Sequence, residues 1–250
     1  MSQNLHPFQR RPLRFLLKNL SIPAFAALTR LEILGEENLP KSGPLLVVGN
    51  HFSFIDPVAF VRMAPWPIEF VGGADNPGAP LWTRIIPFLW GYHKLYRGTG
   101  ASHALRAAEK ILNNGGCLAM FPEGGNWAAV LRPARPGAAF LATRSEARIL
   151  PVGLYGFTDV FPSLGHFQRA RATIHIGKPF GPIKAGGSGR YRREQLDEIG
   201  HTIMYSIAKL LPPGMRGHYS EDPAIREAAR GTEIYPWANK VEGEVKGEVH

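Results

Sequence analysis

Short apolar, β-branched runs alternate along the chain with longer segments of helical spacing, and this alternation restricts the fold more than any other feature. Several of the runs end in glycine or in a polar turn, which is typical of buried strands. The pattern predicts one α/β domain with a largely parallel mixed sheet flanked by helices. The expected strands are 44–49, 68–72, 93–97, 117–121, 149–154 and 172–176, and the expected helices are 58–63, 102–113, 137–144 and 193–211.

The two ends of the chain differ from this alternating centre. Between Arg11 and Leu34, apolar residues recur at helical spacing with basic residues among them. Pro23 interrupts this segment, so we expect a pair of short helices within residues 1–35. Such a basic amphipathic segment either lies on a membrane or packs against its own domain. Residues 216–250 are irregular and predict a mobile tail, which leaves 36–215 as the central domain.

The amino-acid composition limits the kinds of protein and partner that fit this chain, but it does not identify one. The chain has 250 residues, of which 44% are apolar and 20% charged, as in a folded globular protein. The net charge of +9 suits an anionic partner: a nucleic acid, an acidic membrane surface or a phosphorylated substrate. A single cysteine, Cys117, excludes an intrachain disulfide and lies in an expected buried strand. We expect no signal peptide and no membrane-spanning helix.

A histidine and an aspartate stand five residues apart just after the first expected strand of the central domain. His51 follows that strand, and Asp56 opens the next helix. Ligands of open α/β sheets bind at this edge. A histidine there can take a proton from a hydroxyl, and a carboxylate on its other ring nitrogen would fix the tautomer. The spacing alone leaves open that the aspartate only caps the helix.

A second polar turn follows the strand 117–121. It reads Pro-Glu-Gly-Gly, with Glu123, Gly124 and Gly125 expected at the same sheet edge as His51. Glycines in such a turn let backbone N–H groups approach an oxyanion or a phosphate. The alternative is an ordinary turn with a solvated glutamate. The chain contains no nucleophile-elbow, phosphate-loop or zinc-cluster motif.

Taken together, these segments resemble the glycerolipid (lysophospholipid) acyltransferase family. Residues 50–56, Asn-His-Phe-Ser-Phe-Ile-Asp, are similar to its His-x4-Asp block, and 121–124, Phe-Pro-Glu-Gly, match the start of its third block. Residues 94–97 and 149–153 look like the second and fourth blocks, and 135–138 resemble the segment between the third and fourth. The resemblance covers about residues 36–180, and its nearest subfamily is 1-acylglycerol-3-phosphate acyltransferase.

The resemblance implies a reaction and roles for individual residues. An acyl group would pass from acyl-CoA or acyl carrier protein to a lipid hydroxyl, without a cofactor or metal. His51 would be the general base and Asp56 would orient it. The implied substrate-binding residues are Arg97, Glu123, Gly124, Gly125, Arg132 and Arg135. The protein would act in phospholipid biosynthesis as a peripheral protein on the cytoplasmic face of the cell membrane, with membrane lipids rather than nucleic acid as partners.

One departure from the family pattern bears on the acceptor. The third block usually continues with Thr-Arg, but here Gly125 and Asn126 follow Gly124. That arginine helps to hold an acceptor phosphate in the family, so Arg97, Arg132 or Arg135 would have to replace it. A neutral acceptor, such as a glycolipid or amino-lipid, is the alternative. A basic protein that binds nucleic acid or acidic membranes would explain the charge but not the ordered blocks.

Overall fold

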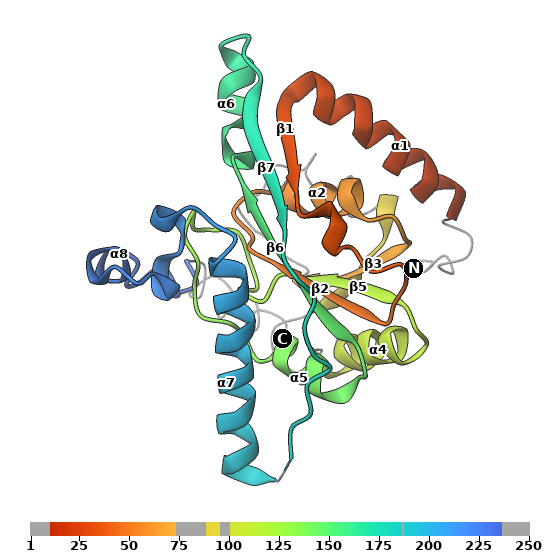
Figure 1. Ribbon diagram of the computed structural model, residues 1–250, viewed down its shortest axis with the longest axis vertical. Helices are drawn as coiled ribbons and strands as arrows, with labels where there is room; N and C mark the ends of the chain where they lie inside the picture. Colours follow the sequence, from red (N-terminus) through yellow and green to blue (C-terminus); the bar gives the residue numbers. More distant parts are fainter. Residues whose placement is uncertain (1–10, 74–88, 96–100, 187, 237–250) are drawn as a thin grey trace, which may run out of the picture.

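A computed structural model describes residues 11–73, 89–95, 101–186 and 188–236 (Figure 1). Within them, seven strands form one sheet in the order β1-β7-β6-β2-β5-β3-β4. All neighbouring strands are parallel except β6 and β7, which are antiparallel, so the predicted mixed α/β sheet is confirmed. The strands are β1 Thr29–Leu34, β2 Leu45–Gly49, β3 Ile68–Gly73, β4 His93–Leu95, β5 Cys117–Met120, β6 Arg148–Tyr155 and β7 Ala170–Ile176.

Helices cover both faces of this sheet (Figure 1). The α-helices are α1 Arg11–Leu28, α2 Asp56–Met63, α4 Ala101–Asn113, α5 Gly137–Arg144, α6 Val160–Gly165, α7 Gly189–Ala208 and α8 Pro223–Ala228. Short 3-10 turns lie at η2 Glu36–Asn38, η4 Phe157–Asp159, η5 Pro213–Met215 and η6 Gly217–Tyr219. The expected helix 137–144 has these bounds, whereas α4 begins one residue and α7 four residues earlier than expected.

The central strand β2 is buried on both faces and separates two hydrophobic cores. Leu46 and Val48 pack with α4, α5 and α7, whereas Leu45 and Val47 pack with α1 and α2. Every residue of β2 is buried. This explains why the strand is a continuous apolar run in the sequence rather than an alternating one.

The N-terminal segment differs from the expected helical pair. It forms one helix, α1, with Pro23 inside it, and then the edge strand β1. A proline removes only its own N–H from the helix, and contacts with the domain compensate for that loss. Arg14 binds both carboxylate oxygens of Glu69, Lys18 donates to the carbonyl of Ala64, and Phe25 is buried.

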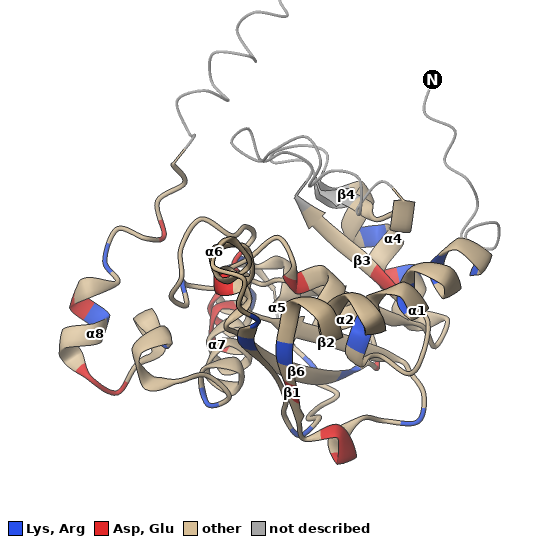
Figure 2. Ribbon diagram, turned by 90° about the horizontal axis from the view of Figure 1, so that it is seen from above, with Lys and Arg blue, Asp and Glu red and all other residues tan. Residues whose placement is uncertain are grey.

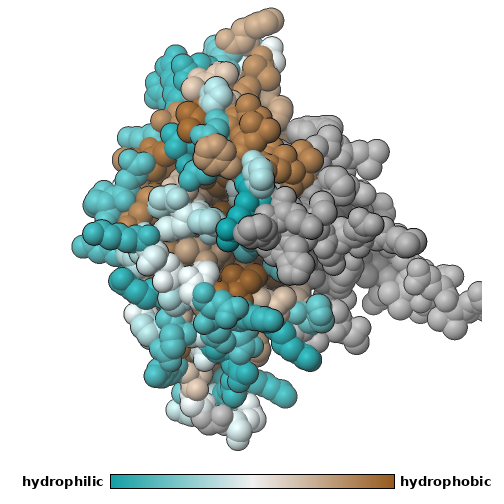
Figure 3. Space-filling view, turned by 90° about the vertical axis from the view of Figure 1, so that its right-hand side faces the viewer, coloured by the Kyte–Doolittle hydropathy of each residue, from teal (hydrophilic) through white to brown (hydrophobic). Residues whose placement is uncertain are grey.

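The opposite side of α1 is apolar and unburied. Phe15, Leu16 and Leu20 are 71%, 53% and 54% exposed. Figure 3 shows the face on which α1 lies, where hydrophobic side chains (brown) gather in the upper half and hydrophilic ones (teal) lie along the left edge and over the lower half. Among the described residues, no helix is long and apolar enough to cross a membrane.

The C-terminal segment is more ordered than the expected irregular tail. Residues 217–219 form η6 and 223–228 form α8. The segment pairs with the loop before α5, since His218 N donates to the carbonyl of Leu131 and Leu131 N to that of Met215. Tyr219 is only 5% exposed. These contacts are tertiary, so local composition did not reveal them.

We expect Gly49→Ala to destabilise the fold, because β2 and α2 approach each other closely at this glycine. A Cβ atom there would lie 2.7 Å from Cζ of Phe60 and 2.9 Å from the carbonyl oxygen of Val152. Overpacking of this kind costs about 1–3 kcal/mol, which urea denaturation would measure. Gly72→Ala is the control, since a Cβ there meets no atom of the described residues within 4 Å. Equal stability of the two variants would contradict the prediction.

Candidate active site

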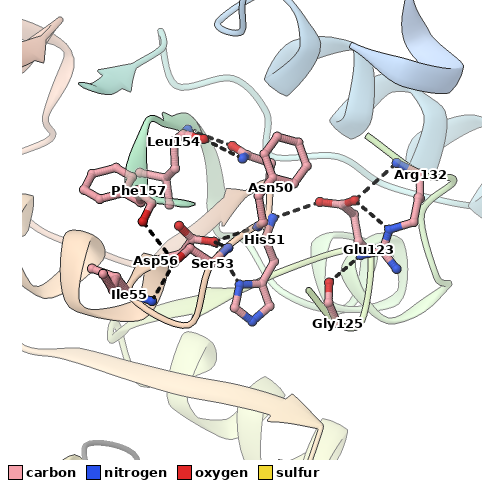
Figure 4. Close-up of polar contacts among 11 residues, drawn as sticks. Asn50, His51, Ser53, Ile55, Asp56, Glu123, Gly125, Arg132, Leu154 and Phe157 are labelled. Carbon is pink, nitrogen blue, oxygen red and sulfur yellow. Dashed lines mark hydrogen bonds and ion pairs between the residues drawn. The ribbon is translucent and has the colours of Figure 1, made fainter. Parts of the chain in front are cut away.

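The His51–Asp56 pair lies where β2 ends and α2 begins (Figure 4). Nδ1 of His51 is 3.0 Å from Oδ2 of Asp56, so the loop between them folds back on itself as the spacing predicted. The His51 side chain is 17% exposed and that of Asp56 is 1% exposed. In Figure 4 the other ring nitrogen of His51, Nε2, points away from Asp56 and Glu123. It is therefore the nitrogen that can meet a substrate.

A single oxygen of Asp56 organises the loop. Besides Nδ1 of His51, Oδ2 accepts hydrogen bonds from the N–H groups of Phe52 and Ser53, both at 2.7 Å. Complete burial raises the pKa of Asp56, while the hydrogen bond and charge of His51 and these two N–H groups act in the opposite direction. The carboxylate thus does more than cap α2, because it sets the position of the histidine ring.

Two aromatic rings stack in succession against the imidazole of His51. Phe121, at the end of β5, stacks on His51 with ring centroids 4.1 Å apart and planes at 15°. Phe60 of α2 stacks on the far side of Phe121, with centroids 5.0 Å apart. Phe121 was predicted as the end of a strand and the first residue of the third block, but not as a partner of His51, so this contact is information from the tertiary structure.

Asn50 is a second residue whose role the sequence did not indicate. Its side-chain nitrogen donates to the carbonyl of Leu154, and its side-chain oxygen accepts from Leu154 N, both at 2.7 Å. Asn50 is fully buried. This two-way amide pairing ties the residue before His51 to the end of β6.

Glu123 lies beside His51, as predicted, but it is not solvated and does not face open space. Its Oε1 accepts from the backbone N–H of His51 at 2.9 Å, and its Oε2 accepts from the N and Nε of Arg132 at 3.2 and 3.1 Å. Glu123 is 2% exposed. The pair therefore joins the second polar turn to the loop that carries His51.

Arg132 is buried, rather than exposed as an open-site ligand for phosphate would be. Its Nη2 donates to the carbonyl of Gly125, and its guanidinium lies 3.8 Å from the ring centroid of Trp127. Arg132 is 1% exposed, and its Nη1 has no hydrogen-bond partner among the residues that the structure describes. In this chain Arg132 acts as the partner of Glu123.

The two glycines of the turn are required by close approach. Gly124 has φ +73°, and a Cβ atom there would lie 2.6 Å from Cδ of Arg135. A Cβ on Gly125 would lie 2.1 Å from the ring of Trp127. Arg135 itself is exposed, so its guanidinium is open to solvent at this turn. Arg97 lies outside the described residues.

A comparison with protein families identifies the class of protein to which this arrangement belongs. The model of the family described as Acyltransferase matches residues 30–155, which contain β1 through β6 and both polar turns. The chain belongs to the acyltransferase family. It is therefore an enzyme, and the resemblance drawn from the His-x4-Asp and Phe-Pro-Glu-Gly segments is confirmed.

Individual relatives carry a narrower name. The acyltransferase is 26% identical over 184 residues to a 1-acyl-sn-glycerol-3-phosphate acyltransferase of Borreliella burgdorferi, with 72% of each chain covered. It is 25% identical over 138 residues to the human 1-acyl-sn-glycerol-3-phosphate acyltransferase alpha, covering 53% of this chain and 48% of the relative. The chain thus spans about half the length of this human relative.

A solved structure shares the fold. The crystal structure of the 1-acyl-sn-glycerophosphate acyltransferase PlsC of Thermotoga maritima aligns with a TM-score of 0.54 at 21% identity. The alignment covers 78% of this chain and 79% of that one. At this identity the likeness supports the fold alone.

The structure also bears on two other kinds of chemistry, nucleophilic catalysis by cysteine and catalysis by a metal ion. Burial raises the pKa of the Cys117 thiol to about 11, so the thiolate that a nucleophile needs is disfavoured. Within the described residues, no group of three or more histidine, cysteine or carboxylate side chains could hold a metal ion. The expectation of metal-free chemistry stays a prediction.

We expect the stability of the acyltransferase to fall as the pH rises through the titration of Glu123. Burial raises the pKa of Glu123 to about 7, even though the Arg132 charge and the His51 and Arg132 N–H groups lower it. The folded state then binds a proton that the unfolded state has already released above about pH 4.5. This contribution to stability is complete below that pH and is lost towards about pH 7.

Urea midpoints measured from pH 5 to pH 8 test this expectation, with Glu123→Gln as the control. Glutamine keeps an oxygen for the His51 N–H but does not titrate. The stability of the wild type relative to Glu123→Gln should decrease as the pH rises. A constant difference between the two proteins would show that Glu123 does not titrate in this range.

Proposed function

We propose that this acyltransferase moves a fatty acyl group from acyl-CoA or acyl carrier protein to the hydroxyl of 1-acylglycerol 3-phosphate, which gives phosphatidic acid. The observation that carries the proposal is the imidazole of His51, whose Nδ1 is held by the buried Asp56 and whose Nε2 is directed away from it. The relatives named 1-acyl-sn-glycerol-3-phosphate acyltransferase support the choice of acceptor.

The reaction needs one general base and no covalent enzyme intermediate. Nε2 of His51 takes the proton of the acceptor hydroxyl as its oxygen attacks the carbonyl carbon of the thioester. An ester C–O bond forms, the C–S bond breaks, and the thiolate leaves and receives the proton from the imidazolium. Asp56 holds the neutral tautomer before the reaction and stabilises the imidazolium during it. The buried Cys117 takes no part.

Arg135 is our candidate for the acceptor phosphate among the described residues. Its side chain is exposed and passes directly over Gly124, on the turn that Glu123 ties to the His51 backbone. An exposed guanidinium can bind a phosphate through two parallel hydrogen bonds. Arg132 cannot do the same without giving up its contacts with Glu123 and Gly125. Arg97 stays a second candidate from its position in the sequence.

A neutral acceptor is the second candidate function, and one observation favours it. Asn126 stands near the position of the arginine that the third block usually carries, and an amide cannot neutralise a phosphate. A glycolipid or amino-lipid acceptor would use the same His51 chemistry. The two functions therefore differ only in what surrounds the acceptor headgroup.

Either acceptor is a lipid, and we propose that α1 brings the enzyme to it by peripheral association with a membrane. The buried side of α1 is fixed to the domain through Arg14 and Phe25, while Phe15, Leu16 and Leu20 are exposed. An apolar face beside basic residues suits the boundary between lipid headgroups and acyl chains.

We expect His51→Ala to lose nearly all acyl transfer while it remains folded. General-base catalysis contributes about 10²- to 10⁴-fold, so kcat should fall by that factor. Asp56→Asn should lose a large part of the activity, because the tautomer is no longer fixed. Release of free CoA from acyl-CoA in the presence of acceptor measures both effects, and circular dichroism checks the fold.

His103→Ala is the matched control, since His103 is exposed on α4 and does not belong to the loop between β2 and α2. It should turn over at the wild-type rate. A folded His51→Ala enzyme with near wild-type turnover would refute the mechanism, whatever the acceptor.

We expect Arg135→Ala and Arg97→Ala each to lower kcat/KM for lysophosphatidic acid if that lipid is the acceptor. Loss of a hydrogen bond to a charged group costs about 1.5–3 kcal/mol, or roughly 10- to 150-fold. Turnover of a neutral lyso-lipid should change little. Arg190→Ala is the control, because this arginine is exposed on α7 and pairs with Glu194.

The wild-type enzyme decides between the two acceptors when both lipids are offered at equal concentration. A preference for lysophosphatidic acid that Arg135→Ala or Arg97→Ala removes supports the phosphate acceptor. A preference for the neutral lipid, with no effect of either arginine, would keep the acyltransferase and remove the phosphatidic-acid assignment.

A further inference from the structure

We propose that the end of α6 inserts into an anionic lipid bilayer as a contact separate from α1. This α6 tip consists of Phe161, Leu164 and Phe167, which are 42%, 48% and 99% exposed. Helix α6 lies at one end of the molecule, at the top of Figure 1, and the segment after it meets the start of β1, since Ala170 pairs with Thr29. Insertion into a bilayer would bury these three apolar side chains together. This is favourable, because their exposure to water costs free energy.

The backbone holds Phe167 outward at an energetic cost. Phe167 has φ +55°, and among the described residues other than glycine it alone has a positive φ. Its N–H donates to the carbonyl of Leu164, and the N–H of Gln168 donates to that of Ser163, which closes the turn. A bulky residue seldom adopts this conformation. The turn therefore leaves the aromatic side chain of Phe167 almost fully exposed.

Arginines at the base of the α6 tip supply charge complementarity to anionic lipids. Arg30 and Arg171 are exposed and are register partners on the neighbouring strands β1 and β7. Arg169 reaches from the same turn to the carbonyl of Thr29. Figure 2, which looks onto this end, shows basic positions (blue) on the chain beside α6 together with acidic ones (red).

The acidic side chains nearest in sequence do not neutralise the positive charge of these three arginines. Glu32 is exposed on β1 and Asp159 precedes α6, where its Oδ1 accepts from the hydroxyl of Thr158. Within the described part of the chain, no ion pair joins either carboxylate to Arg30, Arg169 or Arg171. An apolar tip above a group of arginines is the arrangement that an anionic membrane surface attracts.

Direct contacts join the α6 tip to the loop that carries His51. The hydroxyl of Ser53 donates to the carbonyl of Phe157 at 3.3 Å, and the ring of Phe54 stacks on Phe161 with centroids 5.2 Å apart. A bilayer that holds the tip would thus lie close to the His51 loop. For this consequence alone, the inference rests on the proposed lipid substrate.

Vesicle sedimentation tests the α6 tip directly. The variant is Leu164→Ser with Phe167→Ser, which leaves Phe161 and its contact with Phe54 intact. Tyr191→Ser is the matched control, since Tyr191 is 61% exposed at the start of α7, at the opposite end of the molecule in Figure 1. Vesicles contain equal parts phosphatidylcholine and phosphatidylglycerol, or phosphatidylcholine alone.

The tip variant should bind mixed vesicles about tenfold more weakly than the wild type, while Tyr191→Ser binds normally. Arg30→Gln with Arg171→Gln should weaken binding to the mixed vesicles by about an order of magnitude at low salt and much less at high salt. Leu16→Ser with Leu20→Ser on α1 provides the comparison for the other surface. Unchanged vesicle binding by the folded tip variant would overturn the proposal.

Measurements of acyl transfer distinguish a failure of this inference from a failure of the proposed function. With substrates in detergent micelles, the tip variant should keep wild-type turnover, and with substrates in vesicles it should lose turnover in step with binding. A tip variant that binds vesicles normally but loses activity only with acyl carrier protein as donor would assign the surface to a protein and overturn the proposal. If the wild type transfers no acyl group to lipids but the tip variant still loses vesicle binding, the proposed function is refuted. The proposal that the α6 tip inserts into a bilayer is then still supported.

Discussion

The carboxylate of Asp56 is the group on which the rest of the site depends. Its Oδ2 receives the N–H groups of Phe52 and Ser53 and Nδ1 of His51, so one buried oxygen sets both the backbone of the loop and the orientation of the ring. A carboxylate can be buried in this way only when several donors replace the water that it loses. The loop between β2 and α2 provides all three donors from three consecutive residues, His51, Phe52 and Ser53, which makes the arrangement local.

A second buried charge extends this frame to the neighbouring strand. Glu123 follows β5 and binds the backbone of His51 through one oxygen and Arg132 through the other. Breaking such a buried pair leaves an unpaired charge, so the turn, the His51 loop and the segment before α5 depend on one another. Arg132, stacked on Trp127, continues the connection to the C-terminal segment, because Trp127 Nε1 donates to the carbonyl of Thr232.

The surfaces around the site suit a substrate that arrives from a lipid phase. Exposed apolar side chains occur on α1 and on the α6 tip, and η4, which precedes α6, contacts the His51 loop through Ser53. The exposed Arg135 lies over Gly124, on the turn that Glu123 ties to the backbone of His51. The amphipathic acceptor that we propose needs both apolar and cationic surroundings, and exposed side chains of both kinds occur on the elements around this loop.

The sequence by itself determined the alternating α/β plan, the His51–Asp56 pair and the glutamate turn, because hydrophobic runs, turn residues and short spacings are local properties that tertiary contacts did not override. It did not determine that α1 continues through Pro23, that Thr29–Leu34 becomes an edge strand, or that residues 217–236 pack on the domain, since each depends on partners distant in the chain. Only the tertiary structure decided which arginine near the glutamate turn is exposed. Arg132 and Arg135 are three residues apart and alike in sequence, but burial against Glu123 commits the first to the fold and leaves the second exposed at the turn.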